Sequence, residues 1–240
     1  MSRWRWPLLG GFTAIAMAAG LMLGAVPIAP GEVWAALRDS GASAGPIVRG
    51  LRLPRVLLGF LVGGSLAVSG AVLQALIRNP LADPYLLGIS GGAAIAAVLV
   101  IALGITGAWI LPLAAFVGAM AALLLVYRLS LVQGRRLDAH ILLLAGVVVS
   151  AFTGALVSAV LTLSEAAELR NAFLWMLGGL GAASWQALGV FAAYSVLPLA
   201  VIARESRGFD LLALGDDAAR HIHVERHDTQ VRGWWWRLWR

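Results

Sequence analysis

Six long apolar runs constrain this chain more than any other feature of its sequence. They cover about residues 7–30, 55–77, 86–105, 109–130, 141–163 and 186–203. A helix of about 20 apolar residues crosses the hydrocarbon core of a bilayer, where only helices and closed barrels satisfy their own backbone groups. We therefore expect an all-α fold, a polytopic membrane helix bundle with six transmembrane helices.

The first apolar run follows Arg3 and Arg5, as the apolar part of a cleaved signal peptide would. The apolar region of a signal peptide is about 7–15 residues long, and this run is longer. A retained first transmembrane helix is therefore the favoured interpretation.

The composition excludes several classes of function. Hydrophobic residues make up 60% of the chain and charged residues 12%, with a mean hydropathy of +0.86, whereas a soluble domain is about 25% charged. The chain has no cysteine, which excludes disulfides, thiolate catalysis and cysteine metal sites. All 18 basic residues are arginines, so a phosphate-binding loop that needs a lysine is absent, and an ATPase that drives transport would be another chain. The arginines interrupt the apolar runs rather than line one face, so we expect no nucleic-acid partner.

The distribution of the arginines predicts the orientation. If the N-terminus is cytoplasmic, thirteen arginines fall on the inner side of the membrane and five on the outer side, at positions 38, 49, 52, 55 and 170. Arginine and lysine concentrate in cytoplasmic loops of membrane proteins. We therefore expect a multi-pass protein whose N-terminus lies in the cytoplasm.

Residues 52–92 are the most informative stretch of the chain. An apolar helix rich in glycine, alanine and serine ends at a proline-bounded polar break, residues 78–84, and a second small-residue run follows. Gly59 and Gly63 have the spacing that lets helix backbones approach closely, although ordinary bundle packing produces the same pattern. Hydroxyl residues in this and a later run could line a polar path or bond their own helix backbone, and the sequence leaves both open; they are Ser90, Ser150, Thr153, Ser158 and Thr162.

Three shorter segments have two interpretations each. Arg52 and Arg55 are either snorkelling residues at a helix start or cationic contacts for an acidic partner surface. Residues 171–181 are too short and too rich in glycine to span, which predicts an interfacial or re-entrant helix with tryptophans at the headgroup level. Residues 210–222 form a short amphipathic helix that is either solvated or docked in a partner's groove. The histidines that follow lack metal-ligand spacing, so we expect no metal site.

Five motifs of this chain resemble those of one family of transporters. They are RLPR at 52–55, LVGGSLAVSGAVLQALIRNPLADPYLLGISGGA at 61–93, LLLAG at 142–146, LWMLGGLGAASW at 174–185 and LLALGDDAAR at 211–220. The chain is similar, over roughly residues 50–226, to the permease subunits of bacterial ABC importers for iron-siderophores, haem and vitamin B12, the FecCD type. The resemblance implies a homodimer in the inner membrane, built from subunits of about ten helices, that works with two copies of an ATPase and a periplasmic or lipid-anchored substrate-binding protein. It also implies that this subunit is not an enzyme, binds no cofactor and leaves ATP to its partner.

The resemblance assigns roles to individual positions. Arg52 and Arg55 match the arginines that contact the binding protein. The segment that couples to the ATPase is matched by Leu212, Ala213, Leu214, Gly215, Asp216, Ala219 and Arg220. The pathway and its cytoplasmic gate are matched by Asp138, Ala139, His140, Ser150 and Thr153. Gate positions in the family are often small hydroxyl residues, so Asp138 and Ala139 depart from the pattern.

The resemblance ends near residue 228. We expect a membrane-spanning permease domain, partial by comparison with the family, over residues 1–227, and an aberrant tail rich in tryptophan and arginine over 228–240. That tail is typical of an interfacial anchor, but a frameshifted or truncated reading frame is the favoured interpretation because it begins where a span should start.

The predicted function is import by alternating access, with a ferric siderophore as the first choice of cargo and haem or cobalamin as the others. One alternative is a non-functional truncated remnant of such a permease. Another is an ion-coupled secondary transporter, which usually needs ionisable residues within its spans, whereas here only Asp83 and Asp138 lie near them.

Overall fold

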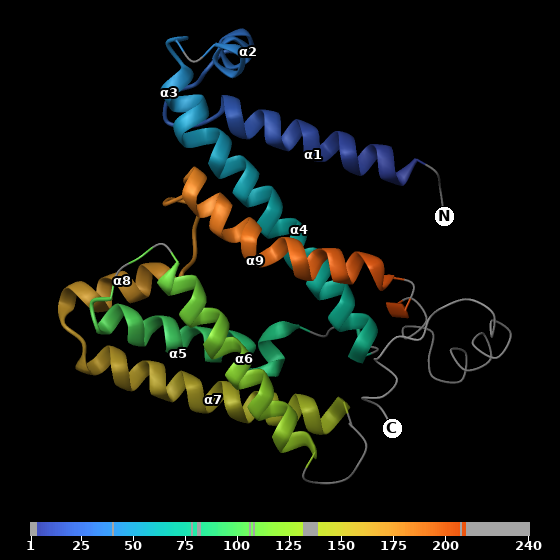
Figure 1. Cartoon of the computed structure of the whole chain (residues 1–240), viewed down its shortest axis with the longest axis vertical. Helices are drawn as coiled ribbons and strands as arrows, with labels where there is room; N and C mark the ends of the chain where they lie inside the picture. Colours follow the sequence, from blue (N-terminus) through green and yellow to red (C-terminus); the bar gives the residue numbers. More distant parts are fainter. Residues whose placement is uncertain are drawn as a thin grey trace, which may run out of the picture. The chain divides into compact units, whose positions relative to one another are not determined.

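The structure is a computed structural model that describes residues 4–39, 41–77, 79–80, 83–105, 107, 109–131, 139–206 and 208–209. Within these ranges every regular element is a helix (Figure 1), which confirms the all-α class. In chain order they are α1 (Arg5–Met22), α2 (Pro30–Arg38), α3 (Gly45–Ile47), the π-helical turn η1 (Val48–Arg52), α4 (Leu53–Ile77), the 3₁₀ turn η2 (Pro84–Leu87), α5 (Ile89–Ala102), α6 (Ile110–Leu131), α7 (Ala139–Leu163), α8 (Ala166–Met176) and α9 (Trp185–Arg204).

Four stretches of helix are long and apolar enough to cross a membrane. They are Gly45–Ile77, which joins α3, η1 and α4, and the helical residues Ile110–Leu131, Ile141–Leu163 and Trp185–Arg204. The first and third predicted spans are shorter than expected, because α1 ends at Met22 and α5 has 14 residues. At 1.5 Å per residue α5 is about 21 Å long, less than the roughly 30 Å of a hydrocarbon core. The predicted count of six crossings is therefore not confirmed.

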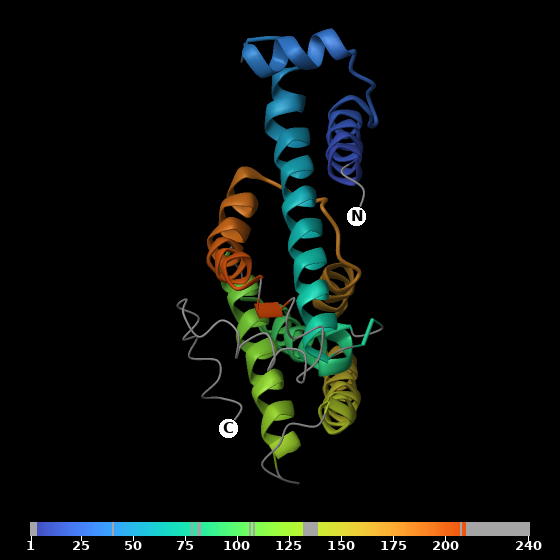
Figure 2. The same cartoon turned by 90° about the vertical axis from the view of Figure 1, so that its right-hand side faces the viewer.

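The helices form two compact units, one of residues 1–67 with 178–199 and one of residues 68–177 with 200–240. In the first unit α2 and the start of α4 meet at the end of α1 (Figure 2). The buried core there consists of Ile28, Val33, Ala36, Ala44 and Val48. Pro30 begins α2, and the Glu32 carboxylate accepts the Ala29 backbone N–H at 3.2 Å, which caps that helix. The polar segment that follows the first run is thus a folded cap rather than a loose loop.

In the second unit α5 packs directly against α6 and α7 (Figure 1). A Cβ atom added at Gly92 would collide with the Gly118 carbonyl and Ala122 of α6, and one added at Gly91 would collide with the Thr153 side chain of α7. Glycine lets helix backbones come this close in lipid. The close approach that Gly59 and Gly63 suggested is not found at Gly63, where an added Cβ would meet no atom within 4 Å. Small residues do allow close helix packing, but the residues that do so are Gly91 and Gly92 of α5 rather than Gly63 of α4.

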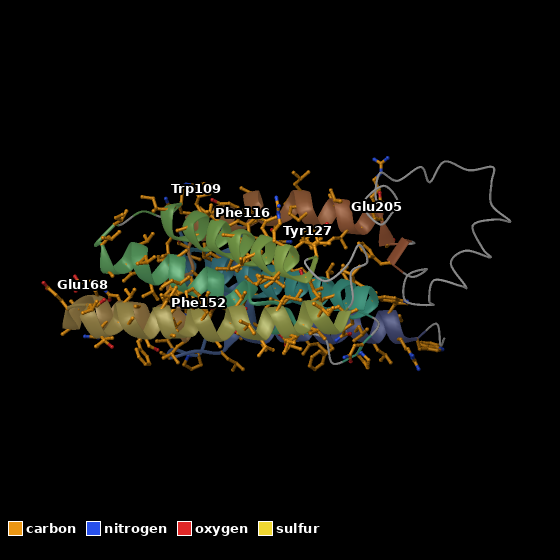
Figure 3. The ribbon with its side chains drawn as sticks, turned by 90° about the horizontal axis from the view of Figure 1, so that it is seen from below. Trp109, Phe116, Tyr127, Phe152, Glu168 and Glu205 are labelled. Carbon is orange, nitrogen blue, oxygen red and sulfur yellow. The ribbon has the colours of Figure 1, made fainter. Side chains whose placement is uncertain are left out.

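The outer surface of the second unit is apolar. Phe116 of α6 and Phe152 of α7 are 52% and 61% exposed, and Figure 3 shows them along the lengths of their helices. The buried residues are few and small, with Val98, Val157 and Ala172 forming one cluster. Large apolar side chains outside and small ones inside are expected of helices that pack in lipid, where no hydrophobic effect drives large residues inward.

Candidate functional site

Three arginines stand at intervals of three residues where η1 runs into α4. Arg49, Arg52 and Arg55 form what we call the arginine series, and each guanidinium donates to backbone carbonyls of a different segment of the first unit. Residues three apart lie on neighbouring positions of one helix surface. The start of α4 is therefore a point at which several parts of the unit are fastened together.

Arg52 holds the end of α1. Its Nη1 donates to the carbonyl oxygens of Leu21 and Met22 at 2.8 and 2.9 Å, and its Nη2 donates to that of Val26. The last carbonyls of a helix have no partner within the helix, and a cation there also interacts favourably with the helix dipole. Arg52 is only 9% exposed, and a Cβ added at Gly24 would lie 3.0 Å from its Nη2. The chain after α1 thus wraps around this guanidinium.

Arg49 holds the end of α2 in the same way. Its Nε and Nη2 donate to the carbonyl oxygens of Ala36 and Leu37, both at 2.6 Å, at the C-terminal end of that helix. The indole Nε1 of Trp185, the first residue of α9, donates to the Arg49 carbonyl at 2.9 Å. Sequence analysis assigned no role to Arg49, although its spacing from Arg52 and Arg55 was visible.

Arg55 is exposed and holds the loop before α9. Its Nε and Nη2 donate to the carbonyl oxygens of Leu180 and Gly181 at 3.0 and 3.2 Å. Gly178 and Gly179 precede this loop with φ of 71° and 155°, a region that favours glycine. Two of the five guanidinium N–H groups are used in this way, so the exposed side chain keeps donors for another group. The two predicted docking arginines therefore differ, one being enclosed and one open.

The segment of residues 171–181, predicted to be an interfacial or re-entrant helix, is helical only as far as Met176. The helix α8 begins earlier, at Ala166, and Glu165 precedes it in an extended conformation. It ends at Met176, after which the glycines turn the chain toward α9. The helix has 11 residues, which agrees with the expectation that this segment is too short to span.

The break between the second and third runs is organised by its own side chains. The Asp83 carboxylate accepts the Tyr85 backbone N–H at 2.7 Å and caps η2, which Pro84 begins. Gly88 has a φ of 72° and turns the chain into α5. The sequence around Asp83 and Gly88 thus specifies a capped turn that ends in a left-handed glycine. This turn leads into α5, whose Gly91 and Gly92 lie against α7 and α6.

The predicted pathway residues of α7 are packed against this turn. The Thr153 hydroxyl is buried and donates within its own helix, to the carbonyls of Val149 and Ser150 at 2.9 and 3.1 Å. The half-buried Ser150 hydroxyl instead donates to the Tyr85 carbonyl of η2 at 3.3 Å. The hydroxyls of Ser158 and Thr162 also bond their own helix. The bonds of Thr153, Ser158 and Thr162 match the alternative of bonding the residue's own helix, whereas Ser150 bonds a different element, η2. Whether Ser150 and Thr153 line a pathway stays a prediction.

The other predicted site residues are described in part or not at all. Ala139 and His140 begin α7, while Asp138 lies outside the described residues. The whole ATPase-coupling segment also lies outside them, so its roles stay predictions: Leu212, Ala213, Leu214, Gly215, Asp216, Ala219 and Arg220. Within the described ranges no three His, Cys, Asp or Glu side chains gather as a metal site would require.

These elements together have the architecture of a membrane permease. A solved structure of an ABC transporter assigned to the metal-chelate type, in an inward-facing conformation, is similar with a TM-score of 0.77 and 25% identity, over 90% of this chain and 66% of that chain. Residues 12–231 match the sequence profile of the FecCD transport family. The chain belongs to that family, which confirms the resemblance seen in its motifs.

Two relatives show the same affiliation. The chain is 40% identical over 188 residues to the hemin transport system permease protein HmuU of Yersinia pestis, covering 76% of this chain and 55% of that protein. It is 40% identical over 197 residues to the vitamin B12 import system permease protein BtuC of Salmonella arizonae, covering 80% of this chain and 58% of that protein. The chain therefore spans less than two thirds of the length of these relatives.

Proposed function

We propose that this chain acts as the permease subunit of an ATP-driven importer that moves a bulky metal chelate across the bacterial inner membrane. The observation that carries the proposal is the family match over residues 12–231. The named cargoes of the relatives are hemin and vitamin B12, and the similar structure is of a metal-chelate type transporter. These cargoes share a metal ion held in a large organic ligand, and within this class we propose a ferric siderophore first, then haem or cobalamin.

Transport in this proposal is alternating access without chemistry on the permease. ATP is consumed by a separate subunit, which shifts the balance only if it binds the two conformations of the permease differently. We propose that residues 211–220 contact that subunit and that the cytoplasmic gate is formed by Asp138 together with Ala139 and His140, the first residues of α7. A second copy of the permease completes the pathway, and the arginine bias supports a cytoplasmic N-terminus.

The arginine series supports two different roles for Arg55 and Arg52 at the surface that we propose meets the binding protein. Arg55 is exposed and keeps guanidinium donors, so we propose that it contacts a carboxylate of the binding protein directly. Arg52 is enclosed by the chain after α1, so we propose that it contributes by holding residues 21–26 in place. Charge at such a surface governs encounter and orientation more than final affinity.

The experiment that tests the proposed function is uptake in a bacterial strain that lacks its own permeases of this family. The coding sequence is expressed with its ATPase and binding protein, and uptake of radiolabelled ferric siderophore, haemin and cobalamin is compared. We expect one cargo to accumulate above the empty-vector level, and only when the ATPase is active. Uptake of none of the three, with the permease present in the membrane, would contradict the proposal.

A further inference from the structure

An apolar groove lies between the end of α1 and α2 in the first unit. It has a volume of about 260 Å³ and is lined by Ala18, Leu21 and Met22 of α1 and by Pro30, Val33 and Leu37 of α2, with Trp34 at its edge. The neighbouring residues of α1 are strongly exposed, among them Phe12 and Ile15. The groove therefore continues an exposed apolar surface of α1, which we expect to face lipid.

A cation stands at the edge of this groove. The Arg38 guanidinium lies 4.5 Å from the centre of the Trp34 ring, which is 58% exposed. Stacking on an aromatic face holds a guanidinium in place while its N–H groups stay available. Tryptophan and arginine are the residues that favour the headgroup level of a membrane.

The carboxylates near Arg38 are engaged elsewhere. Glu32 accepts the Ala29 backbone N–H and Asp39 accepts that of Gly41. Within the part of the chain that the structure describes, neither pairs with Arg38. Arg49 is directed at the end of α2. Arg38 is thus the cation of α2 that is free to meet an anion from outside.

We propose that this groove binds an anionic phospholipid, with one acyl chain between α1 and α2 and the phosphate on Arg38. The apolar lining suits a hydrocarbon chain and excludes a polar ligand, whereas the stacked cation sits where the headgroup of a lipid beside α1 would lie. The site attracts anionic lipids over zwitterionic ones because a zwitterionic headgroup carries its own cation beside the phosphate, which offsets the attraction to Arg38. A bound lipid of this kind fastens α2 to the membrane surface next to the arginine series.

The test is native mass spectrometry of the purified full chain in a mild detergent with equal amounts of phosphatidylglycerol and phosphatidylcholine. We expect phosphatidylglycerol adducts to predominate. Arg38→Gln should lower the ratio of the two adducts by about fivefold, the contribution of one arginine near a membrane surface. The matched control is Arg128→Gln, which removes another exposed arginine, at the end of α6, and should leave the ratio unchanged.

A second variant tests the groove itself. Ala18→Trp fills the groove from an exposed position, so both adducts should decrease while helical circular dichroism stays the same. Should this variant fail to fold, the Arg38→Gln ratio still decides the proposal. An unchanged ratio in Arg38→Gln, an equal loss in Arg128→Gln, or full retention of both lipids by a folded Ala18→Trp variant would overturn it. A dimer of the chain that forms without lipid and is lost in Ala18→Trp would also overturn it, because the groove would then hold a second copy.

Discussion

The helices inside each of the two compact units are held together by a different kind of contact. In the first unit, guanidinium groups of the arginine series bond carbonyls at the ends of α1 and α2 and in the loop before α9. In the second unit, glycines bring α5 into contact with the backbone of α6 and with side chains of α7. One unit thus depends on charge and hydrogen bonds at helix ends, the other on shape along helix lengths.

This difference indicates which changes each unit tolerates. A guanidinium bond to a carbonyl can be exchanged for water or for another donor, so loss of one arginine releases a local segment. Closely packed helix backbones have no such substitute, since an added side chain must move a whole helix. We therefore expect the second unit to be sensitive to volume and the first to be sensitive to charge.

The largest effect should follow Gly92→Leu in α5. Its side chain would occupy the place of the Gly118 carbonyl and of Ala122, so the helices must separate. We expect a loss of about 3 kcal/mol or more, since overpacking here displaces backbone rather than a flexible side chain. Thermal unfolding in detergent and the yield of monodisperse protein measure it. The control is Gly154→Leu on α7, where an added Cβ meets no atom within 4 Å; equal losses in both variants would contradict the contrast.

Sequence reasoning predicted the apolar helices but not which glycines pack. The runs of α4, α6, α7 and α9 agree with their predicted positions within a few residues, because hydropathy and length are local properties. Gly59 and Gly63 of α4 have the spacing that suggests close packing, whereas the adjacent Gly91 and Gly92 of α5 do not. The difference between them lies in the partner helix that faces each pair, and no local pattern contains that information. The end of α1 at Met22 also depends on a residue far along the chain, Arg52.

The second largest effect should follow Arg52→Gln. The substitution removes the positive charge and leaves fewer donors for the carbonyls of Leu21, Met22 and Val26. A hydrogen bond to a charged group contributes about 1.5–3 kcal/mol, so we expect residues 21–26 to open more easily by roughly 2–4 kcal/mol. Hydrogen exchange of the amides in this segment measures the change.

The outcome for Arg52→Lys sharpens the same test. Lysine keeps the charge but not the planar fork that reaches several carbonyls, so it should restore only part of the protection. Unchanged exchange in Arg52→Gln would show that the enclosed guanidinium does not hold the end of α1. Faster exchange in α5 than in residues 21–26 would contradict the assignment of charge sensitivity to the first unit.

The two docking arginines show where sequence reasoning stopped. A pair of outer arginines around Pro54 could be recognised as a candidate surface for an acidic partner, since residue type and topology are readable. The exposure of each arginine could not be predicted, because it depends on contacts with distant segments. Arg52 contacts the end of α1 and Arg55 contacts the loop before α9. Arg49 was missed for the same reason, as its acceptors in α2 are more than ten residues away.

A smaller effect on stability is expected for Arg55→Glu, with a larger one on partner binding. Arg55 is exposed and makes two bonds to a surface loop, so the thermal unfolding midpoint should change little. If Arg55 meets an acidic surface, charge reversal should weaken binding of the substrate-binding protein about tenfold or more, because one charge pair becomes a repulsion. Surface plasmon resonance at two salt concentrations measures this. Arg170→Glu, another exposed arginine, is the control, and equal weakening by both would remove the specific role of Arg55.

The smallest effect on stability is expected for Thr153→Val in α7. Valine keeps the shape that packs against Gly91 and loses a hydroxyl that bonds only its own helix, so the expected cost is about 1 kcal/mol or less. Thr153→Leu is the partner variant, and it should cost more because a larger side chain collides with α5. The thermal unfolding midpoints of the two variants measure the difference between their stability losses. If uptake falls severalfold in Thr153→Val while the unfolding midpoint is unchanged, the hydroxyl serves the cargo and Thr153 lines the pathway. Unchanged uptake would show that Thr153 serves only to pack against Gly91. In that case the shape of the side chain, and not its hydroxyl, would matter at this position of the second unit.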